Sequence, residues 1–324
     1  MQCNPFLLKL LQKGLGIPLL LIAFAAFAAQ PVVVASIKPV HALVAGVMLG
    51  VGEPLLLIPG GASPHEYSLK PSDTRALGKA QVVFWIGPDL ESFLVKPLAN
   101  VKSARSEALM DAPGVTVLPL REGGAWEQHQ HGHDSHDHAK RGADKHNHDH
   151  EASRDPHIWL DPVNAGALVR RIVAVLGEVD PFHQADYTRN GAALIERLDQ
   201  LNRQLATALA PVKDQPYIVF HDAYQYFEQR YGLNAVGSVV LKPEQRPGAK
   251  RVADIQARVS DLKVLCVFSE PQFQPALVET IIAGSDARRG VLDPLGADLP
   301  AGPDAYLQLL QALTDAVRGC LTRA

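Results

Sequence analysis

The sequence predicts an α/β protein of two lobes, each a mainly parallel sheet flanked by helices, joined by one long rigid backbone helix. Two observations predict this fold. Short β-branched runs alternate with amphipathic stretches in both halves of the chain, and a leucine-patterned segment lies between the halves. With 324 residues, 47% of them hydrophobic, the chain is long enough for each lobe to bury its own core,.

Apolar runs predict the strands of both sheets. They are continuous rather than alternating, which is typical of parallel strands covered on both faces. The runs of the first half are 32–34, 55–58, 82–86 and 115–118. Those of the second half are 217–220, 235–240, 264–268 and 291–292.

A single amphipathic helix is predicted at 181–210, between the lobes. Pro181 opens the segment and Pro211 ends it,. About thirty residues at 1.5 Å each span about 45 Å, which is enough to cross both lobes. The apolar face of this helix follows from leucines at spacings of four and three, namely Leu194, Leu198, Leu201, Leu205 and Leu209.

The segment 1–28 is expected to be a signal peptide. Two lysines precede a short apolar run, and Ala26-Phe27-Ala28 has the small-residue form of a cleavage site,. A transmembrane anchor is the alternative, but the run is short and Pro18 interrupts it,. The protein is then expected in the periplasm, with its lobes at 29–180 and 211–324.

Export would place the cysteines in an oxidising compartment. After removal of 1–28 two remain, Cys266 and Cys320. An even number in such a compartment predicts a disulfide, and two buried free thiols are the alternative. On the chain-entropy model a bridge over this span stabilises the second lobe by about 4 kcal/mol.

The segment 123–154 departs from the α/β pattern because it is polar, low in complexity and rich in histidine. With almost no apolar residues to bury, it is expected to be a mobile loop. Closely spaced imidazoles suit Zn²⁺, although a solvated linker or a tag is the alternative. The candidates for weak secondary metal sites are His129, His131, His133, His136, His138, His146, His148 and His150.

Three histidines outside this loop are candidates for a specific metal site. His65 follows the second apolar run, His221 closes the fifth, and His157 begins an apolar turn just after the loop. Ligands of parallel sheets bind beyond the carboxyl ends of the strands, so these imidazoles can converge only where the lobes face each other. Each alone could be a structural histidine. His41 and His183 are expected at the surface and are left out.

The segments around these histidines resemble the metal-site segments of the cluster A-I solute-binding proteins. Within that family they are similar to the ZnuA-type zinc receptors of ABC importers, whose internal His/Asp loop resembles 123–154. The resemblance covers essentially the whole chain after the signal segment. It is carried by 61–73, 155–162, 220–224, 266–273 and 292–296.

The resemblance implies a periplasmic receptor that holds Zn²⁺ in the cleft between its lobes with His65, His157 and His221. It also implies that the bridge between Cys266 and Cys320 is shared with the family. Further implications are a monomer and delivery of zinc to an ABC importer membrane permease, whose ATPase is a separate subunit.

The ligand types favour zinc over manganese, because three neutral imidazoles are borderline donors whereas manganese sites use more carboxylate. Pro64 stands where some zinc receptors of this type carry a glutamate. The fourth ligand is therefore expected to be water, with Asp293 as the alternative. Since coordinating imidazoles must be neutral, zinc affinity is expected to fall as the pH drops through about 6.5.

A zinc-dependent hydrolase is the main alternative, because catalytic zinc also keeps three protein ligands and a water. Glu66 and Glu270 would be its general bases. However, Leu69 stands where a His-Glu-x-x-His motif beginning at His65 needs its second histidine, and the sequence has no nucleophile elbow or phosphate-binding loop,. A metal-binding surface adhesin is a third possibility. A net charge of −3 without a basic stripe argues against a nucleic-acid binder,.

Overall fold

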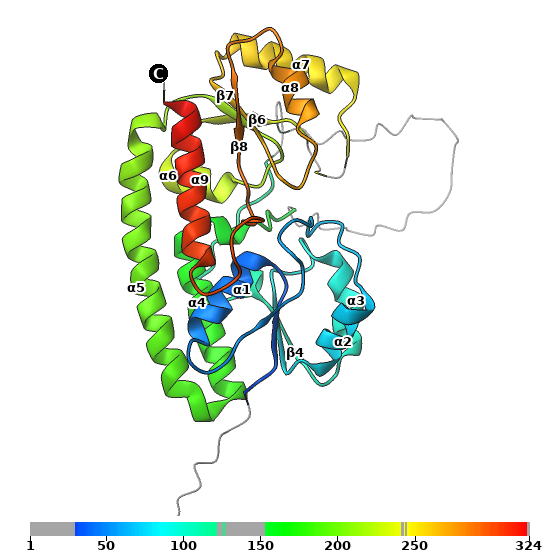
Figure 1. Cartoon of the computed structure of the whole chain (residues 1–324), viewed down its shortest axis with the longest axis vertical. Coiled ribbons are helices and arrows are strands. Elements are labelled where there is room, and N and C mark those ends of the chain that lie inside the picture. Colours follow the sequence, from blue (N-terminus) through cyan, green and yellow to red (C-terminus); the bar gives the residue numbers. More distant parts are fainter. Residues whose placement is uncertain (1–29, 122–125, 127–152, 241–242, 244, 323–324) are drawn as a thin grey trace, which may run out of the picture.

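Two four-stranded parallel sheets form the framework of the protein (Figure 1). The computed structural model describes residues 30–121, 126, 153–240, 243 and 245–322. The first sheet has the order β2-β1-β3-β4, with β1 Val33–Ala35, β2 Leu55–Leu56, β3 Val82–Trp85 and β4 Arg105–Ala108. The second has the order β6-β5-β7-β8, with β5 Tyr217–Val219, β6 Ala235–Ser238, β7 Cys266–Ser269 and β8 Arg288–Val291. The predicted fold class is confirmed.

Helices cover both faces of the first sheet, with α2 and α3 on one side and α1 and α4 on the other (Figure 1). The helices of this half are α1 Lys38–Val47, α2 Pro71–Lys79, α3 Val95–Asn100 and α4 Pro162–Val179. Those of the second half are α6 Gln225–Tyr231, α7 Ala249–Asp261, α8 Ala276–Ile282 and α9 Ala305–Leu321. Within the described ranges, no helix has the length and apolar character needed to cross a membrane.

The long helix predicted at 181–210 is α5, Gln184–Leu209, with short 3-10 segments before and after it at Pro181–His183 and Ala210–Val212. It passes both sheets in Figure 1, and α1, α4 and α9 pack against it. Its predicted leucine face is buried, with the side chains of Leu194, Leu198, Leu201, Leu205 and Leu209 inside the protein. The spacing of the leucines therefore explains how this helix joins the halves.

One hydrophobic core extends through both lobes. Phe84 of the first sheet, Leu198 of α5, Phe268 of the second sheet and Leu310 of α9 all belong to the same buried cluster. Separating the lobes widely would expose these apolar side chains, which costs about 25 cal/mol for each Å². The shared core therefore holds the facing ends of the two sheets near each other.

The fourth strand of the first sheet was predicted at 115–118, and this prediction is wrong. The strand is instead Arg105–Ala108, which pairs with β3. It forms the sheet edge and its sequence is mostly polar, so it gives no apolar run. The stretch 115–118 is extended outside the sheet, where the backbone of Thr116 exchanges two hydrogen bonds with the side chain of Asn164 in α4.

A disulfide joins Cys266 at the start of β7 to Cys320 in α9, so the predicted pairing is confirmed. The two residues are 54 positions apart. The bridge fastens the last helix to the second sheet, and both cysteines are buried in the shared core.

Replacing both cysteines with alanine is expected to lower the free energy of unfolding by about 4 kcal/mol, because the unfolded chain gains the freedom of the opened loop. Urea denaturation of the wild type and of the Cys266→Ala/Cys320→Ala variant measures the difference. A loss below about 1 kcal/mol would show that strain or residual structure in the unfolded chain cancels the constraint.

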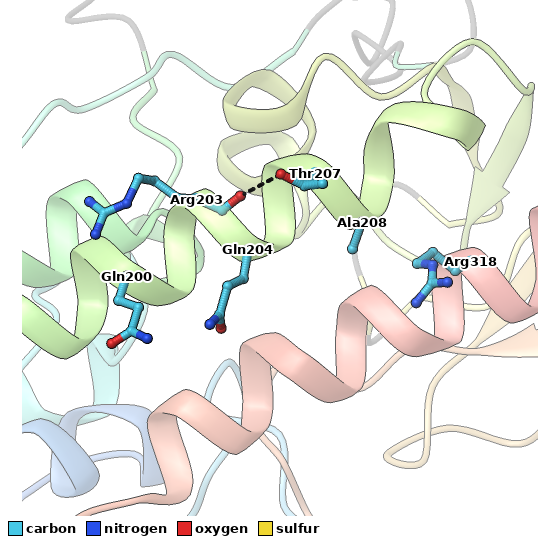
Figure 2. A pocket seen from close by; sticks show the side chains of 6 residues that line it. All are labelled: Gln200, Arg203, Gln204, Thr207, Ala208 and Arg318. Carbon is cyan, nitrogen blue, oxygen red and sulfur yellow. Dashed lines mark hydrogen bonds between the residues drawn. The ribbon is translucent and has the colours of Figure 1, made fainter.

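A surface groove of about 460 Å³ runs between α5 and α9 (Figure 2). Its lining consists of Gln200, Arg203, Gln204, Thr207, Ala208 and Arg318. These side chains include no histidine, cysteine or carboxylate, which are the groups that bind zinc in proteins. This groove therefore does not suit a zinc ion.

Candidate metal centre

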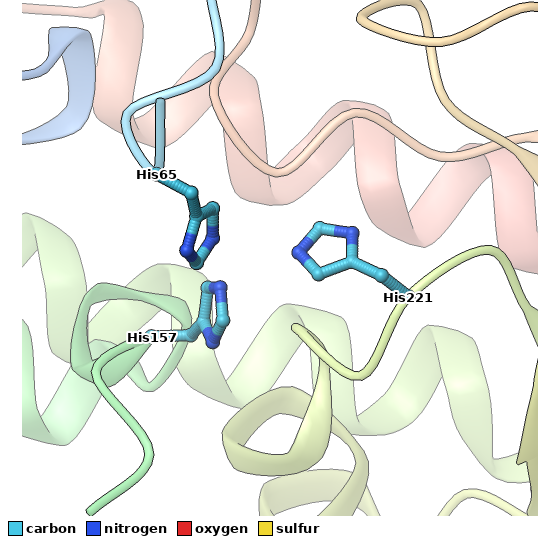
Figure 3. Close-up of side chains that lie close together, drawn as sticks. All are labelled: His65, His157 and His221. Atoms are coloured by element: carbon cyan, nitrogen blue, oxygen red, sulfur yellow. The ribbon is translucent and has the colours of Figure 1, made fainter. Parts of the chain in front are cut away.

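The histidines predicted to converge, His65, His157 and His221, lie together between the lobes (Figure 3). His65 comes from the loop after β2, His221 follows β5, and His157 directly precedes the 3-10 segment Ile158–Leu160. Their ring centroids are 5.4, 5.7 and 5.3 Å apart. One ligand nitrogen from each ring lies within 4.8 Å of the others. Bonds of about 2.1 Å to a tetrahedral zinc place the ligand nitrogens roughly 3.4 Å apart. Small inward rotations of the three rings would bring their nitrogens to this spacing.

A buried carboxylate orients the ring of His157. Asp155 Oδ1 lies 2.7 Å from Nδ1 of His157 and also accepts the backbone N–H of the same residue at 3.0 Å. With Nδ1 as the donor to this carboxyl group, Nε2 keeps the lone pair that can bind a metal. Within the described part of the chain, this buried Nε2 has no hydrogen-bond partner.

The ring of His221 is oriented in the same way by Glu270, which follows β7. Glu270 Oε1 lies 2.7 Å from Nδ1 of His221 and accepts the backbone N–H of His221 at 3.3 Å. Because β5 and β7 are neighbours in the sheet, the residues after their carboxyl ends meet,. Glu270 thus supports a histidine and does not stand free as a general base.

Burial lowers the pKa of His65 and of His157 well below the ordinary value of 6.5. Loss of hydration is the largest cause, since it disfavours the charged ring. Nearby imidazoles lower the pKa of both rings further, whereas Asp222 raises that of His157. Both rings are therefore neutral at pH 7, in the form that coordinates metal.

The space beside the three rings is about 10 Å³, roughly the room of one water-sized sphere, which suits a single ion,. Apolar side chains close it, namely those of Trp159, Phe273, Pro294 and Leu295. A wider cavity of about 250 Å³ adjoins the rings, and Arg121 and Ser153, close to the two ends of 122–152, line it. The described residues that flank 122–152 therefore line the cavity beside the three rings.

Asp293, the alternative fourth ligand, is not brought into the cluster of ligand atoms. Its carboxylate accepts hydrogen bonds from Gln272 Nε2 at 2.9 Å and from the backbone N–H groups of Leu295 and Ala297. These bonds fix the carboxylate in the loop that follows β8. The arrangement favours water as the fourth ligand.

His41 was expected at the surface, and this prediction is wrong. His41 is buried in α1, where its Nε2 lies 3.0 Å from the carbonyl oxygen of Pro54. Its position near the helix start suggested exposure, but α1 packs against α4, α5 and α9. His183 is half-buried beside Asp180, with 2.6 Å between Nδ1 and Oδ2. The eight histidines of 129–150 lie outside the described residues.

The supporting carboxylates Asp155 and Glu270 were not predicted as partners of the histidines. Asp155 has a local signal, because it stands two residues before His157 and can reach both its N–H and its ring. The only sequence signal for Glu270 is its position directly after a predicted strand. Its contact with His221 depends on the order of the strands in the sheet, in which β5 and β7 are neighbours.

Replacing either carboxyl group by its amide, in Asp155→Asn or Glu270→Gln, is expected to weaken zinc binding by about 10- to 100-fold, because the amide oxygen holds the Nδ1 proton of the histidine less strongly. Competition with a zinc-binding dye measures the change. Asp180→Asn is the matched control, since Asp180 pairs with His183 in the same manner away from the cluster. Equal losses in all three variants would point to a general loss of stability.

The protein is therefore a two-lobed α/β protein with a candidate metal centre. Each lobe contains one parallel sheet, and the imidazole cluster lies between the facing ends of the two sheets. Comparison with known sequences gives the family. Residues 33–320 match the family described as zinc-uptake complex component A, periplasmic. The chain belongs to this family.

Curated relatives cover nearly the whole chain. The high-affinity zinc uptake system protein ZnuA of Brucella suis biovar 1 is 49% identical over 306 residues, covering 90% of this chain and 92% of that one. The protein of the same name from Yersinia pestis is 37% identical over 324 residues, covering 97% and 98%.

Solved structures share the fold. A crystal structure of ZnuA aligns with a TM-score of 0.75 at 24% identity, covering 91% of this chain and 100% of that one. The periplasmic zinc-binding protein TroA from Treponema pallidum aligns with a TM-score of 0.75 at 20% identity, with the same coverage. The two-lobed architecture is therefore common to this chain and to both proteins.

Proposed function

We propose that this chain is a periplasmic receptor that binds Zn²⁺ with high affinity and delivers it to the membrane permease of an ABC importer. His65, His157 and His221 hold the ion, and water completes its coordination. The observation that carries the proposal is the convergence of three imidazoles, two of them with buried carboxylate partners, in an enclosed space of ion size. The relatives named as zinc uptake proteins support zinc as the cargo.

The same proposal divides the chain into a signal peptide at 1–28, lobes at 29–180 and 211–324, and a linking helix at 181–210. The receptor is proposed to act as a monomer, and one chain supplies all three imidazoles of the site. Its permease partner works with a separate ATPase.

The histidines of 129–150 gather zinc weakly and raise its concentration at the mouth of the site. Arg121 and Ser153, which flank this segment, line the cavity that adjoins the three imidazoles, and this supports a transfer of zinc from the segment to the site. Each of these sites is proposed to bind zinc less tightly than the three-imidazole site, because a polar segment with almost no apolar residues to bury gains little that offsets the entropy lost on chelation.

Deleting 125–152 is therefore expected to leave one tight zinc site and to lower the total number of zinc ions bound. Calorimetric titration counts both classes of site. A full-length variant with the eight loop histidines changed to serine separates the loss of imidazoles from the shortening of the chain. Loss of the tight site in either variant would contradict this division of roles.

The function is tested in bacteria that lack their own zinc receptor but keep the permease and ATPase. We expect the chain to restore growth and ⁶⁵Zn uptake in chelator-treated medium, and His221→Ala to restore neither at equal periplasmic abundance. Uptake that is restored equally by His221→Ala would overturn the proposed site. Zinc-dependent hydrolysis by the purified chain would favour the enzyme, and matrix binding that survives loss of His65 would favour the adhesin.

A further inference from the structure

The three histidines of the site are not held equally. His157 and His221 are buried, 4% and 5% exposed, and each ring is fixed by a carboxylate. His65 is half-buried, and within the described ranges its ring has no carboxylate partner; its backbone N–H donates to Ser63 Oγ at 3.3 Å. The position of His65 therefore depends on how its loop is seated.

The loop of His65 rests on the opposite lobe through Gly60. A side chain at this position would place its Cβ 2.9 Å from Cα of Ala297 and 2.7 Å from Nζ of Lys38. The carbonyl oxygen of Gly60 also lies 3.4 Å from Nε2 of Gln272. The backbone of the loop thus touches the segment after β8 directly, which only glycine permits here.

Lys38, at the start of α1, fixes that segment. Its ammonium group donates hydrogen bonds to the carbonyl oxygens of Gly296, Ala297 and Leu299 at 2.7, 2.8 and 2.8 Å. An ammonium group has three donors, so this carbonyl cage satisfies all of them. Lys38 is 7% exposed and reaches a segment 258 residues away in the sequence, so it links the two halves of the chain beside the metal site.

Gln272 makes the second link. Its amide donates to Asp293 Oδ1 at 2.9 Å and lies within reach of the carbonyl oxygen of Gly60. Asp293 in turn accepts backbone N–H groups of the segment that Lys38 holds. Lys38 therefore anchors the 293–299 segment, and Gln272 joins Asp293 at the start of that segment to the loop of His65 at Gly60.

We propose that Lys38 and Gln272 are the positioning residues of His65, and that His65 is the ligand that leaves zinc first when their contacts with the 293–299 segment open. The inference rests on the proposed function, because it assigns an order to ligands of that same site. His157 and His221 stay fixed by their carboxylates, so they form the part of the site that persists. Asp293 acts through Gln272 and not on the ion.

The test is the rate of zinc release from the full mature chain to an excess of chelator, followed by stopped flow. Lys38→Met and Gln272→Met should each release zinc about 10- to 100-fold faster, the range found for residues that orient a metal ligand. Gly60→Ala should do the same, because the added Cβ would meet Lys38 Nζ and the backbone of Ala297 and push the loop away from the segment after β8. Arg197→Gln, which breaks the exposed ion pair of α5 with Asp304, is the control and should leave the rate unchanged.

A double-mutant cycle separates positioning from general stability. In a His65→Ala background, Lys38→Met and Gln272→Met should cause no further acceleration, because their effect runs through the missing ring. Equal acceleration in both backgrounds, or none in either, would overturn the inference. Gln272→Met carries the same test if Lys38→Met does not fold. If His65→Ala itself leaves zinc binding unchanged, the proposed function fails, and the two failures are thereby distinguished.

Discussion

Replacing both His157 and His221 with alanine is expected to lower the affinity for zinc by about four orders of magnitude. Zinc binding by a complete site contributes about 10–16 kcal/mol, so each of its ligands accounts for about 3 kcal/mol, or about two powers of ten. The two rings are the buried, carboxylate-paired members of the cluster, and their loss removes the fixed part of the site. Competition with chelators of known affinity measures the change.

The control for this variant is His183→Ala, which removes an imidazole that is also paired with a carboxylate but lies outside the cluster. Its zinc affinity should equal that of the wild type. If the double variant keeps tight binding at full stoichiometry, the ion is held elsewhere in the chain, and the histidines of 129–150 become the first candidates.

Zinc affinity is expected to stay nearly constant from pH 8 to about 6.5 and to fall steeply at lower pH. Only the neutral rings bind zinc, so protons compete below the pKa of the metal-free rings. Because the pKa values of His65 and His157 are lowered well below 6.5, the fall begins at a lower pH than free imidazoles would give. Once all three rings are protonated, the affinity falls by up to about 1,000-fold for each pH unit.

Titrations at pH 7.5, 6.5, 5.5 and 4.5 give this profile, with circular dichroism at each pH to confirm that the chain stays folded. Free imidazole, whose pKa lies near 6.5, is the reference for this profile. Tight binding that already fades at pH 6.5 would mean that the rings of the tight site are not shielded from water.

Much of the fold followed from patterns that a sequence displays directly. The leucines of α5 recur at helical spacing, and the buried strands read as apolar runs. The edge strand Arg105–Ala108 was missed because an edge needs no apolar composition, while 115–118 is apolar yet bonds to Asn164 and Tyr226 outside the sheet. Pairing with the sheet depends on tertiary context that local composition does not contain.

For the candidate site, the sequence predicted the ligands but not the residues that surround them. Three histidines stood out because each follows a predicted strand or a predicted loop, near the strand ends where parallel sheets bind ligands. They are His65, His157 and His221. Their environment could not be predicted, because it depends on contacts between distant segments. Glu270 reaches His221 across 49 residues, and Lys38 reaches Gly296 across 258. The burial of His41 likewise depends on the helices that pack around α1.

The most direct test of the zinc site is anomalous diffraction at the zinc edge from crystals of the mature chain loaded with one equivalent of Zn²⁺. We expect one strong peak between the lobes, about 2.0–2.1 Å from a ring nitrogen of each of His65, His157 and His221, with a water in the fourth position. A peak coordinated by other residues, or zinc bound only within 123–154, would contradict the assignment of these three histidines.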